Sequence, residues 1–222
     1  MAEQQHTAKI LMTGFVTHNV KRFVIERPDG YDFTPGQATE MALPETPDDG
    51  HPFTFTSLTD DKVLEFTIKG YYDHDGMTKK LHAKGPGDKV LIGDSWGAIT
   101  HRGPGVFIAG GAGVTPFIAI LRRLRDDGNA DGHRLLFSNH TTADVICEKE
   151  FRAMLGDDFV STLTREDVPG HLHRRIDADF LKKHVDDFSQ NFYVCGPDPF
   201  VADINDALKD LGAKPDSLVF EE

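Results

Sequence analysis

Cysteine is nearly absent from this sequence. Among 222 residues there are two cysteines, Cys147 and Cys195. Their spacing fits neither a disulfide framework nor a paired-cysteine metal site, and two thiols cannot supply the four ligands of an iron–sulfur cluster. We therefore expect no metal centre, and a reducing, cytoplasmic setting is the default for such a chain.

Long hydrophobic runs are also missing. No apolar stretch approaches the roughly 20 residues that a helix needs to cross a bilayer. The opening segment "MAEQQHTAKILM" lacks the basic start and the apolar segment of an export signal. The sequence thus predicts no membrane span and no secretion.

Positively charged residues are fewer than negatively charged ones. The 24 lysine and arginine residues are outnumbered by 36 aspartate and glutamate residues, which gives a net charge of −12. A nucleic acid or an anionic membrane surface would on average be repelled, so neither is an expected partner. With 39% hydrophobic residues, the chain still has enough apolar material for packed cores.

Up to about residue 100 the sequence predicts short β-strands. Runs of β-forming residues are separated by turn signals such as Pro28-Asp29-Gly30 and Pro35-Gly36. One short helix is expected in "MTKKLHA" (77–83). Strands at this spacing favour an antiparallel sandwich or a small barrel.

From residue 105 onward the pattern changes to alternating strands and helices. The expected strands are "GVFIAG", "HRLLFSN", "FVSTLTRE", "NFYVCG" and "DSLVF". This alternation predicts an open parallel sheet with helices on both faces. Thr115 and Asp198 are expected to cap two of the helices, each of which carries a proline in its first turn. We place one domain at residues 1–101 and a second at residues 105–222.

Two loops follow strands of the expected parallel sheet, where ligands usually bind. In "AGGAGVTP" (109–116) backbone N–H groups can face a diphosphate, although a tight turn of small residues explains the glycines equally well. The loop matches neither the G-x-G-x-x-G pattern nor a P-loop. "YVCGPDP" (193–199) ends a strand with Cys195, which is either a buried small thiol or a residue that faces the cleft.

A third segment, "GHPFTFTSLTDD" (50–61), places an imidazole, an aromatic ring and a hydroxyl in succession. One interpretation is packing, in which Phe53 and Phe55 fill a core while the threonines face water. The other interpretation is a ligand-binding strand. The segment alone does not distinguish them.

Considered together, these motifs resemble the ferredoxin–NADP⁺ reductase superfamily over almost the whole chain. The motifs that carry the resemblance are a Pro-Gly-Gln turn, "HPFT", "DGMT", "GGAGVTP", "LTRE" and "VCGPDPF". The resemblance implies an antiparallel six-stranded β-barrel that holds FAD, followed by a five-stranded parallel α/β domain that binds NADPH or NADH. Hydride would pass from NAD(P)H to FAD, and electrons would pass on to an external acceptor such as a flavodoxin, a ferredoxin or a small molecule.

The resemblance also assigns roles on the flavin side. "HPFT" resembles the flavin strand of the NADPH oxidase and ferric reductase branch, so Phe53 would stack on the flavin and Thr54 would hydrogen-bond its N5. His51 stands where most members have an arginine for the diphosphate, and a histidine offers a weaker, single-donor substitute. The other residues assigned to the flavin are Pro52, Ile68, Lys69, Gly76, Met77 and Thr78.

On the nucleotide side, Cys195 would help to place the nicotinamide ring. Thr164 and Arg165 correspond to the place where NADP-preferring members hold the 2′-phosphate, which favours NADPH over NADH, with Arg174 and Arg175 as further candidates. The remaining residues assigned to the nucleotide are Gly111, Gly113, Val114, Thr115, Gly196 and Pro197. Near the end of the sequence, Glu221 matches a glutamate placed close to flavin N5, so the catalytic candidates are Thr54, Cys195 and Glu221.

Two questions stay open in the sequence. Lys79, Lys80, Lys84 and Arg102 form a candidate basic patch for an acidic electron acceptor, but the acceptor itself is not identified. The replacement of arginine by His51 also permits a different class of protein, a non-catalytic nucleotide-binding or electron-transfer subunit of a larger complex.

Overall fold

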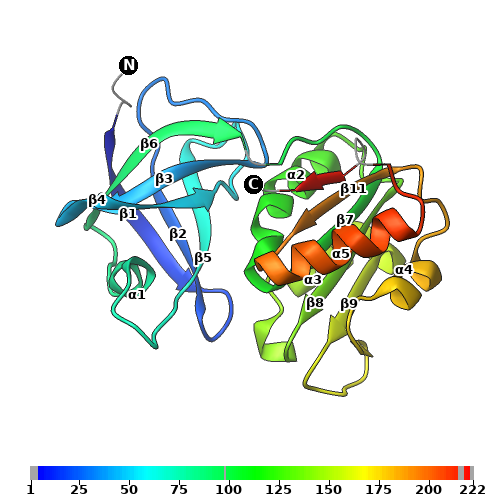
Figure 1. The fold of residues 1–222 in the computed structure, drawn as a ribbon. Helices are drawn as coiled ribbons and strands as arrows, with labels where there is room; N and C mark the ends of the chain where they lie inside the picture. Colours follow the sequence, from blue (N-terminus) through cyan, green and yellow to red (C-terminus); the bar gives the residue numbers. More distant parts are fainter. Residues whose placement is uncertain (1–4, 98, 215–217, 221–222) are drawn as a thin grey trace.

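The computed structural model describes residues 5–97, 99–214 and 218–220 (Figure 1). Two sheets lie side by side, one in each half of the chain. We call residues 5–97 the barrel half, and residues 105–214 with 218–220 the parallel half.

The barrel half contains six antiparallel strands in the order β4-β3-β6-β1-β2-β5. Their bounds are β1 (His6–Phe15), β2 (Val20–Glu26), β3 (Gln37–Leu43), β4 (Thr46–Thr54), β5 (Val63–Lys69) and β6 (Lys89–Gly97). The two outer strands approach each other where Phe55, directly after β4, bridges to Phe66 of β5. The predicted six-stranded antiparallel barrel is therefore confirmed, and so is the short helix, α1 (Met77–His82).

Aromatic rings fill the barrel around Phe55. This residue is fully buried, and its ring centroid lies 4.3 Å from that of Phe33 and 5.1 Å from that of Phe66. Phe53 is only partly buried at the edge of the same core. The packing interpretation of this strand is thus half right, because Thr54 and Thr56 are buried instead of facing water.

The parallel half contains one parallel sheet in the order β10-β9-β8-β7-β11-β12. Its strands are β7 (Gly105–Gly110), β8 (His133–Asn139), β9 (Phe159–Leu163), β10 (Leu172–His173), β11 (Asn191–Cys195) and β12 (Leu218–Phe220). All five predicted strands are present, and the two-residue strand β10 extends the sheet at one edge.

Helices cover both faces of this sheet, as predicted. They are α2 (Thr115–Asp126), α3 (Glu148–Leu155), α4 (Ala178–His184) and α5 (Asp198–Asp210), with short 3₁₀ turns η1 (Gly111–Val114), η2 (Thr142–Asp144) and η3 (Gly156–Asp158). Successive residues of β7 point to opposite faces. Phe107 packs with α2 and α3 in one core, whereas Val106 and Ile108 pack with α4 and α5 in the other.

The two predicted helix caps are wrong. Thr115 is the first residue of α2, and its hydroxyl donates to the carbonyl of Ala112 at 3.0 Å instead of accepting a helix N–H. Asp198 is likewise the first residue of α5, after Pro197. In both cases the preceding loop runs directly into the helix, which places these side chains one position too late to cap.

The barrel and parallel halves share a core. Val20 of β2 and Ile99 of the connecting segment are both buried in the cluster formed by α2, α3 and the sheet. The connecting segment is also tied to the sheet, because the Tyr193 hydroxyl donates to the carbonyl of Gly103 at 2.7 Å and accepts the N–H of Arg102 at 2.9 Å. This packing fixes how the two halves face each other.

Among the helices of the described residues, none combines the length and the apolar character that a bilayer crossing needs.

Candidate functional site

A cavity of about 780 Å³ lies between the barrel half and the parallel half. Its volume falls within the range of roughly 300–1,000 Å³ that is usual for cofactor and ligand sites. Residues from both halves form its wall, including the carboxyl ends of β7, β8 and β11. The cavity therefore lies where an open parallel sheet is expected to bind a ligand.

Most of the predicted site residues line this cavity. From the barrel half they are Pro52, Phe53, Thr54, Ile68, Lys69 and Thr78, and from the parallel half Gly111, Gly113, Thr115, Thr164, Cys195, Gly196 and Pro197. The structure thus brings together two sets of residues that are far apart in the sequence.

Five predicted residues lie elsewhere. Met77 and Val114 are buried in the two cores. The His51 side chain is exposed, with its Nε2 at 3.3 Å from Oδ1 of Asp49. Arg165 is exposed outside the cavity wall. Gly76 also lies outside this wall and is partly buried beside the His74 ring. Glu221 lies outside the described residues.

On the barrel side the cavity wall is made of hydroxyls and rings. Thr54 closes β4, opposite Ala38 of β3, and is 8% exposed. Thr67 of β5 also lines the cavity, and its Oγ1 lies 3.4 Å from Oγ1 of the buried Thr56. This wall therefore presents hydroxyl groups beside the partly buried ring of Phe53.

Tyr71 is a site residue that the sequence analysis missed. Its ring lines the cavity and is 49% exposed, with Nζ of Lys69 at 5.5 Å from the ring centroid. Its N–H donates to Oγ1 of Thr78 at 3.3 Å, so the Thr78 hydroxyl can still donate its own proton. The aromatic pair directly after a strand, in "IKGYYD", was the available signal.

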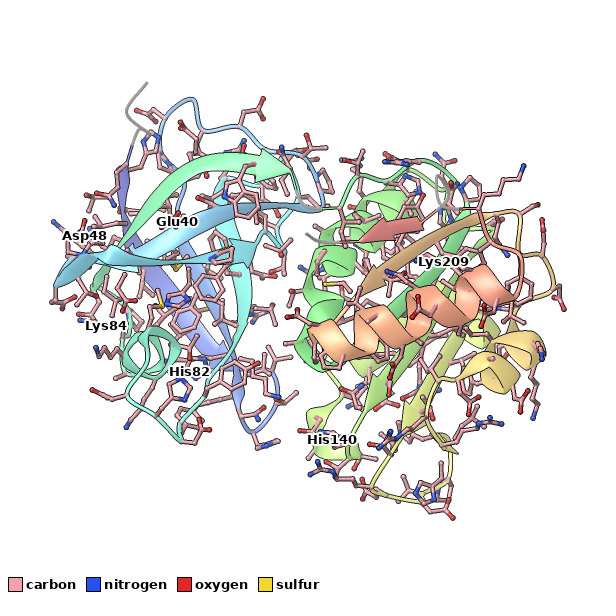
Figure 2. The ribbon with its side chains drawn as sticks, viewed as in Figure 1. Glu40, Asp48, His82, Lys84, His140 and Lys209 are labelled. Atoms are coloured by element: carbon pink, nitrogen blue, oxygen red, sulfur yellow. The ribbon has the colours of Figure 1, made fainter. Side chains whose placement is uncertain are left out.

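The end of β5 is held by His82. Its Nε2 lies 2.9 Å from the carbonyl of Ile68, and its Nδ1 lies 2.7 Å from the hydroxyl of Tyr72. Burial lowers the pKa of His82, so the ring is neutral, and the carbonyl requires the proton on Nε2. Figure 2 labels His82, the last residue of α1, on the barrel side.

Two glycines of the loop after β7, Gly111 and Gly113, are required for different structural reasons. A Cβ on Gly113 would lie 2.5 Å from the backbone of Cys195 and Gly196, so this glycine lets two loops touch. Gly111 has a φ of +55° and open space around it. Of these two glycines, Gly111 is therefore the one whose backbone leaves room for a ligand.

One side chain of the cavity wall has no hydrogen-bond partner among the described residues. Both polar atoms of the Asn139 side chain, at the carboxyl end of β8, are buried without a hydrogen bond. Such orphaned groups are rare in folded proteins, and a bound ligand is one way to satisfy them.

Around Asn139, polar side chains gather at one end of the cavity. Nδ1 of His140 lies 3.0 Å from Oγ1 of Thr164, and Arg175 also contributes to the wall. Of the arginines considered for this region, Arg175 lines the cavity, whereas Arg174 pairs with Asp177 outside it. Figure 2 labels His140 at the edge of the parallel half that faces the barrel.

The candidate basic patch is not assembled as one group. Lys79 pairs with Asp75 at 3.6 Å, and Lys84 pairs with Glu45. Helix α1 and the connecting segment that contains Arg102 lie at opposite ends of the barrel (Figure 1). Within the described residues there is also no cluster of three or more side chains suited to a metal ion.

Comparison with known proteins confirms the predicted resemblance. Residues 107–206 match the family model of the oxidoreductase NAD-binding domain. The reductase component of propane 2-monooxygenase from Rhodococcus jostii (strain RHA1) is 26% identical over 211 residues, which cover 88% of this chain and 56% of that protein. The ferredoxin–NAD(P)⁺ reductase component of a naphthalene 1,2-dioxygenase system from Pseudomonas putida is 22% identical, covering 96% of this chain and 69% of that protein.

Solved structures share the fold over nearly the full chain. A ferredoxin–NADP⁺ reductase from Neisseria gonorrhoeae, crystallised with FAD and NADP, matches with a TM-score of 0.83 at 22% identity and covers 94% of this chain and 92% of that one. The FAD/NAD-binding domain of a nitric oxide dioxygenase from Vibrio cholerae O1 biovar El Tor matches with a TM-score of 0.86 at 21% identity, covering 97% of both chains. The chain spans just over half the length of the propane 2-monooxygenase reductase components, 54–59%.

Proposed function

We propose that this chain is an NAD(P)H-dependent reductase that binds FAD, receives hydride from NAD(P)H and passes electrons to an external acceptor. The observation that carries the proposal is one cavity lined by the flavin strand of the barrel half and by both nucleotide loops of the parallel half. Hydride transfer needs two cofactors in direct contact, and a shared cavity between two binding walls meets that need.

The barrel wall fits a flavin. Phe53 offers a partly buried aromatic face, and Thr54 and Thr67 offer hydroxyls at the depth of the cavity. Thr78 keeps a donor for a phosphate oxygen, and Lys69 adds a positive charge beside it. Because His51 points away toward Asp49, phosphate binding on this side falls to Lys69, Thr78 and the neighbouring backbone.

The parallel wall fits a dinucleotide. The open space at Gly111 leaves room for a diphosphate near the start of α2, where the helix dipole favours negative charge. The unpartnered amide of Asn139 offers one donor and one acceptor at the end where His140 and Arg175 gather.

In catalysis, FAD when bound supplies the hydride acceptor and the two-electron store. The chain's own residues bind, orient and exclude water. Thr54 would donate a hydrogen bond at the flavin edge, while Cys195, only 6% exposed, closes the opposite wall with its neighbour Gly196. Neither Thr54 nor Cys195 needs to act as an acid or a base of shifted pKa, because the rate of hydride transfer depends mainly on how the two cofactors are positioned.

We further propose that NADPH is preferred over NADH. A 2′-phosphate adds negative charge, and Arg175 and His140 at one end of the cavity are the side chains that could pair with it. The acceptor is proposed to be an external protein, as the names of the relatives suggest, either a ferredoxin-type carrier or an oxygenase component.

The domain boundaries are proposed as residues 1–101 for the FAD-binding barrel and residues 105–222 for the NAD(P)-binding domain. The change from antiparallel to parallel pairing on either side of the connecting segment supports this division. A cytoplasmic location is also proposed, because both cysteines are at least partly buried and neither forms a disulfide.

Anaerobic titration tests the function. The purified protein is mixed with FAD, freed of unbound flavin, and then given NADPH or NADH under argon while the flavin absorbance is recorded. We expect stoichiometric FAD and bleaching by a nicotinamide cofactor. A protein that retains no FAD and oxidises neither cofactor would contradict the proposal and favour the non-catalytic subunit, for which the outward position of His51 is the supporting observation.

A further inference from the structure

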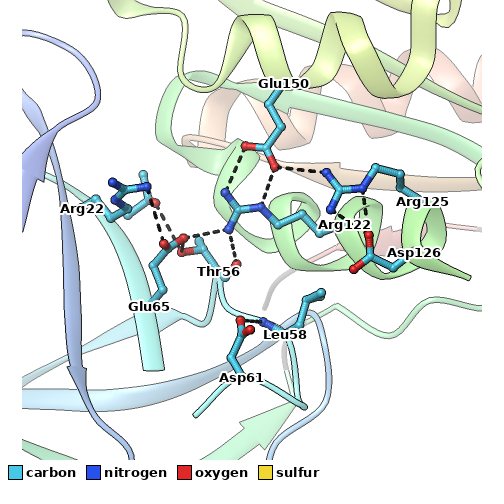
Figure 3. A network of polar contacts seen from close by, with 10 residues as sticks. Arg22, Thr56, Leu58, Asp61, Glu65, Arg122, Arg125, Asp126 and Glu150 are labelled. Atoms are coloured by element: carbon cyan, nitrogen blue, oxygen red, sulfur yellow. Dashed lines mark hydrogen bonds and ion pairs between the residues drawn. The ribbon is translucent and has the colours of Figure 1, made fainter. Parts of the chain in front are cut away.

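A partly buried ion-pair network joins the two halves of the molecule (Figure 3). Arg122 lies on α2 and Glu150 on α3, both in the parallel half, whereas Glu65 lies on β5 of the barrel. The side chains of Arg122 and Glu65 are 17% and 15% exposed. Buried charges are costly to desolvate, and replacing such pairs by apolar residues is often neutral or stabilising, so cohesion alone does not explain this network.

Arg122 divides its hydrogen bonds evenly between the two halves. Its Nε and Nη2 donate to the two carboxylate oxygens of Glu150 at 2.7 and 3.0 Å. Its Nη1 donates to Oε1 of Glu65 at 2.7 Å and to the carbonyl of Thr56 at 2.6 Å. A planar guanidinium with partners on both sides specifies one relative placement of those partners.

The network stays charged. Burial by itself would lower the pKa of Arg122, but the hydrogen bonds and charges of Glu150 and Glu65 raise this pKa above its usual value. Burial by itself would raise the pKa of Glu150, and the hydrogen bonds from Arg122 lower it instead. Arg122 and Glu150 therefore each stabilise the charged form of the other.

On the barrel side, Arg122 holds the segment that carries the cavity hydroxyls. Thr56 follows Thr54 by two residues, and its N–H donates to the carbonyl of Glu65 at 2.7 Å while its hydroxyl donates to Oε1 of Glu65 at 3.0 Å. Glu65 precedes Thr67 by two residues on the same strand, so Arg122 acts two residues away from both cavity threonines.

On the parallel side, Arg122 belongs to the helix that continues the glycine loop. Helix α2 begins at Thr115, directly after η1 (Gly111–Val114). Arg122 lies seven residues later, which is two turns along the same helix face. A rigid helix of this length transmits the position of Arg122 to the loop.

We propose that Arg122 is a positioning residue for hydride transfer. It fixes the Thr54 wall against the glycine loop through Thr56, Glu65 and α2, without touching the cavity itself. This inference rests on the proposed function.

The first test separates transfer from binding. In FAD-loaded protein, Arg122→Met should lower the limiting rate of flavin reduction by NADPH about 10- to 100-fold, because small displacements of reacting groups have effects of that size. The FAD content and the Kd for NADPH should stay within about twofold of wild type. Arg122→Lys, which keeps the charge without the fork, should recover only part of the rate.

The first test needs a matched control variant and a second variant in case Arg122→Met does not fold. Arg152→Met removes an exposed arginine that pairs with Glu148 within α3, and it should leave the rate unchanged. If Arg122→Met does not fold because the partly buried Glu150 has lost its main partner, the double variant Arg122→Met/Glu150→Gln removes that charge as well.

The second test needs no cofactor. Amide hydrogen exchange in FAD-free protein should speed up at Thr56 and along β5 in Arg122→Met and in Glu65→Gln, with the β7–β8 core unchanged. Unchanged exchange at Thr56, or a reduction rate equal to wild type in a variant with full FAD, would overturn the inference. If wild-type protein takes up no FAD, the proposed function fails, and the exchange data alone decide whether Arg122 holds the two walls together.

Discussion

The two walls of the cavity differ in whether backbone or side chains face the ligand space. The two glycine-containing loops of the parallel half present mainly backbone, because Gly113 abuts the Cys195–Gly196 backbone and Gly111 adopts a φ of +55°. The barrel half presents side chains, namely hydroxyls and aromatic rings on β4, β5 and the segment after β5. Changes in these two loops should therefore affect folding and binding together, whereas changes in the barrel wall should affect chemistry and leave the fold intact.

The largest effect is expected at Gly113. The Cβ of Gly113→Ala would lie 2.5 Å from the backbone of Cys195, so one of the two loops must move. We expect a loss of roughly 1–3 kcal/mol in the free energy of unfolding, as for other overpacked sites, together with weaker NADPH binding. Urea unfolding and NADPH titration measure the two effects, and Gly14→Ala, with nothing within 4 Å of the added carbon, is the control.

At Thr54, in the barrel wall, we expect a loss of reaction rate without a loss of stability. Thr54→Val keeps the shape of the side chain and removes the hydroxyl. Flavin reduction should slow about tenfold, which corresponds to the loss of one hydrogen bond of roughly 1–1.5 kcal/mol, while the urea midpoint changes little. Thr54→Ser retains the hydroxyl and should stay close to wild type in stopped-flow reduction. A valine variant that unfolds readily but reduces its flavin at the normal rate would reverse the proposed division between the two walls.

Arg175 and Arg165 offer a contrast within the parallel half. Arg175 lines the cavity and Arg165 does not. Arg175→Ala should weaken NADPH binding about tenfold and leave NADH binding nearly unchanged, because one charge-assisted hydrogen bond is lost. Arg165→Ala should affect neither cofactor. Isothermal titration with both cofactors checks this, and equal losses for NADPH and NADH would remove the proposed role of Arg175.

The smallest effect is the expected change in the free energy of unfolding with pH. It depends on one histidine in the barrel half and one in the connecting segment. Burial lowers the pKa of His82, and burial together with the nearby His133 lowers the pKa of His101. Nε2 of His101 lies 3.0 Å from Nε2 of His133, a contact in which one of the two nitrogens must accept the hydrogen bond.

The sign of this effect follows from linkage. A histidine whose pKa is lowered by folding adds stability above its unfolded pKa of about 6.5, and that stability is lost as the pH falls below it. The free energy of unfolding should therefore decrease from about pH 8 to about pH 5, with a smaller decrease in His101→Phe. An identical pH dependence in His101→Phe and wild type would show that this histidine does not contribute.

Much of the fold could be predicted from the sequence. Alternation with a period of two, the uninterrupted apolar strand at residues 105–110 and the proline-opened helices depend on local residue order, so both sheets and their helices were expected. The presence of Thr54, Gly111 and Cys195 in the cavity wall followed from the resemblance of their motifs to the ferredoxin–NADP⁺ reductase superfamily.

Other placements could not be predicted from residue order, because several partners were open to each side chain. His51 turns toward Asp49, Thr115 bonds back to its own loop, and Arg175 instead of Arg165 reaches the cavity. Each of these side chains is long or polar enough to have several possible partners, and only the folded surroundings select one.

Local order therefore determined which segments become strands, helices and glycine loops, since these follow from backbone conformation and hydrophobic period. Only the tertiary structure decided that Arg122 ties β5 and Thr56 to α2, because residues 57 positions or more apart in the chain must first be brought within 3 Å. Long-range contacts of this kind leave no periodic trace in a sequence, and the separation of the two cavity walls depends on them.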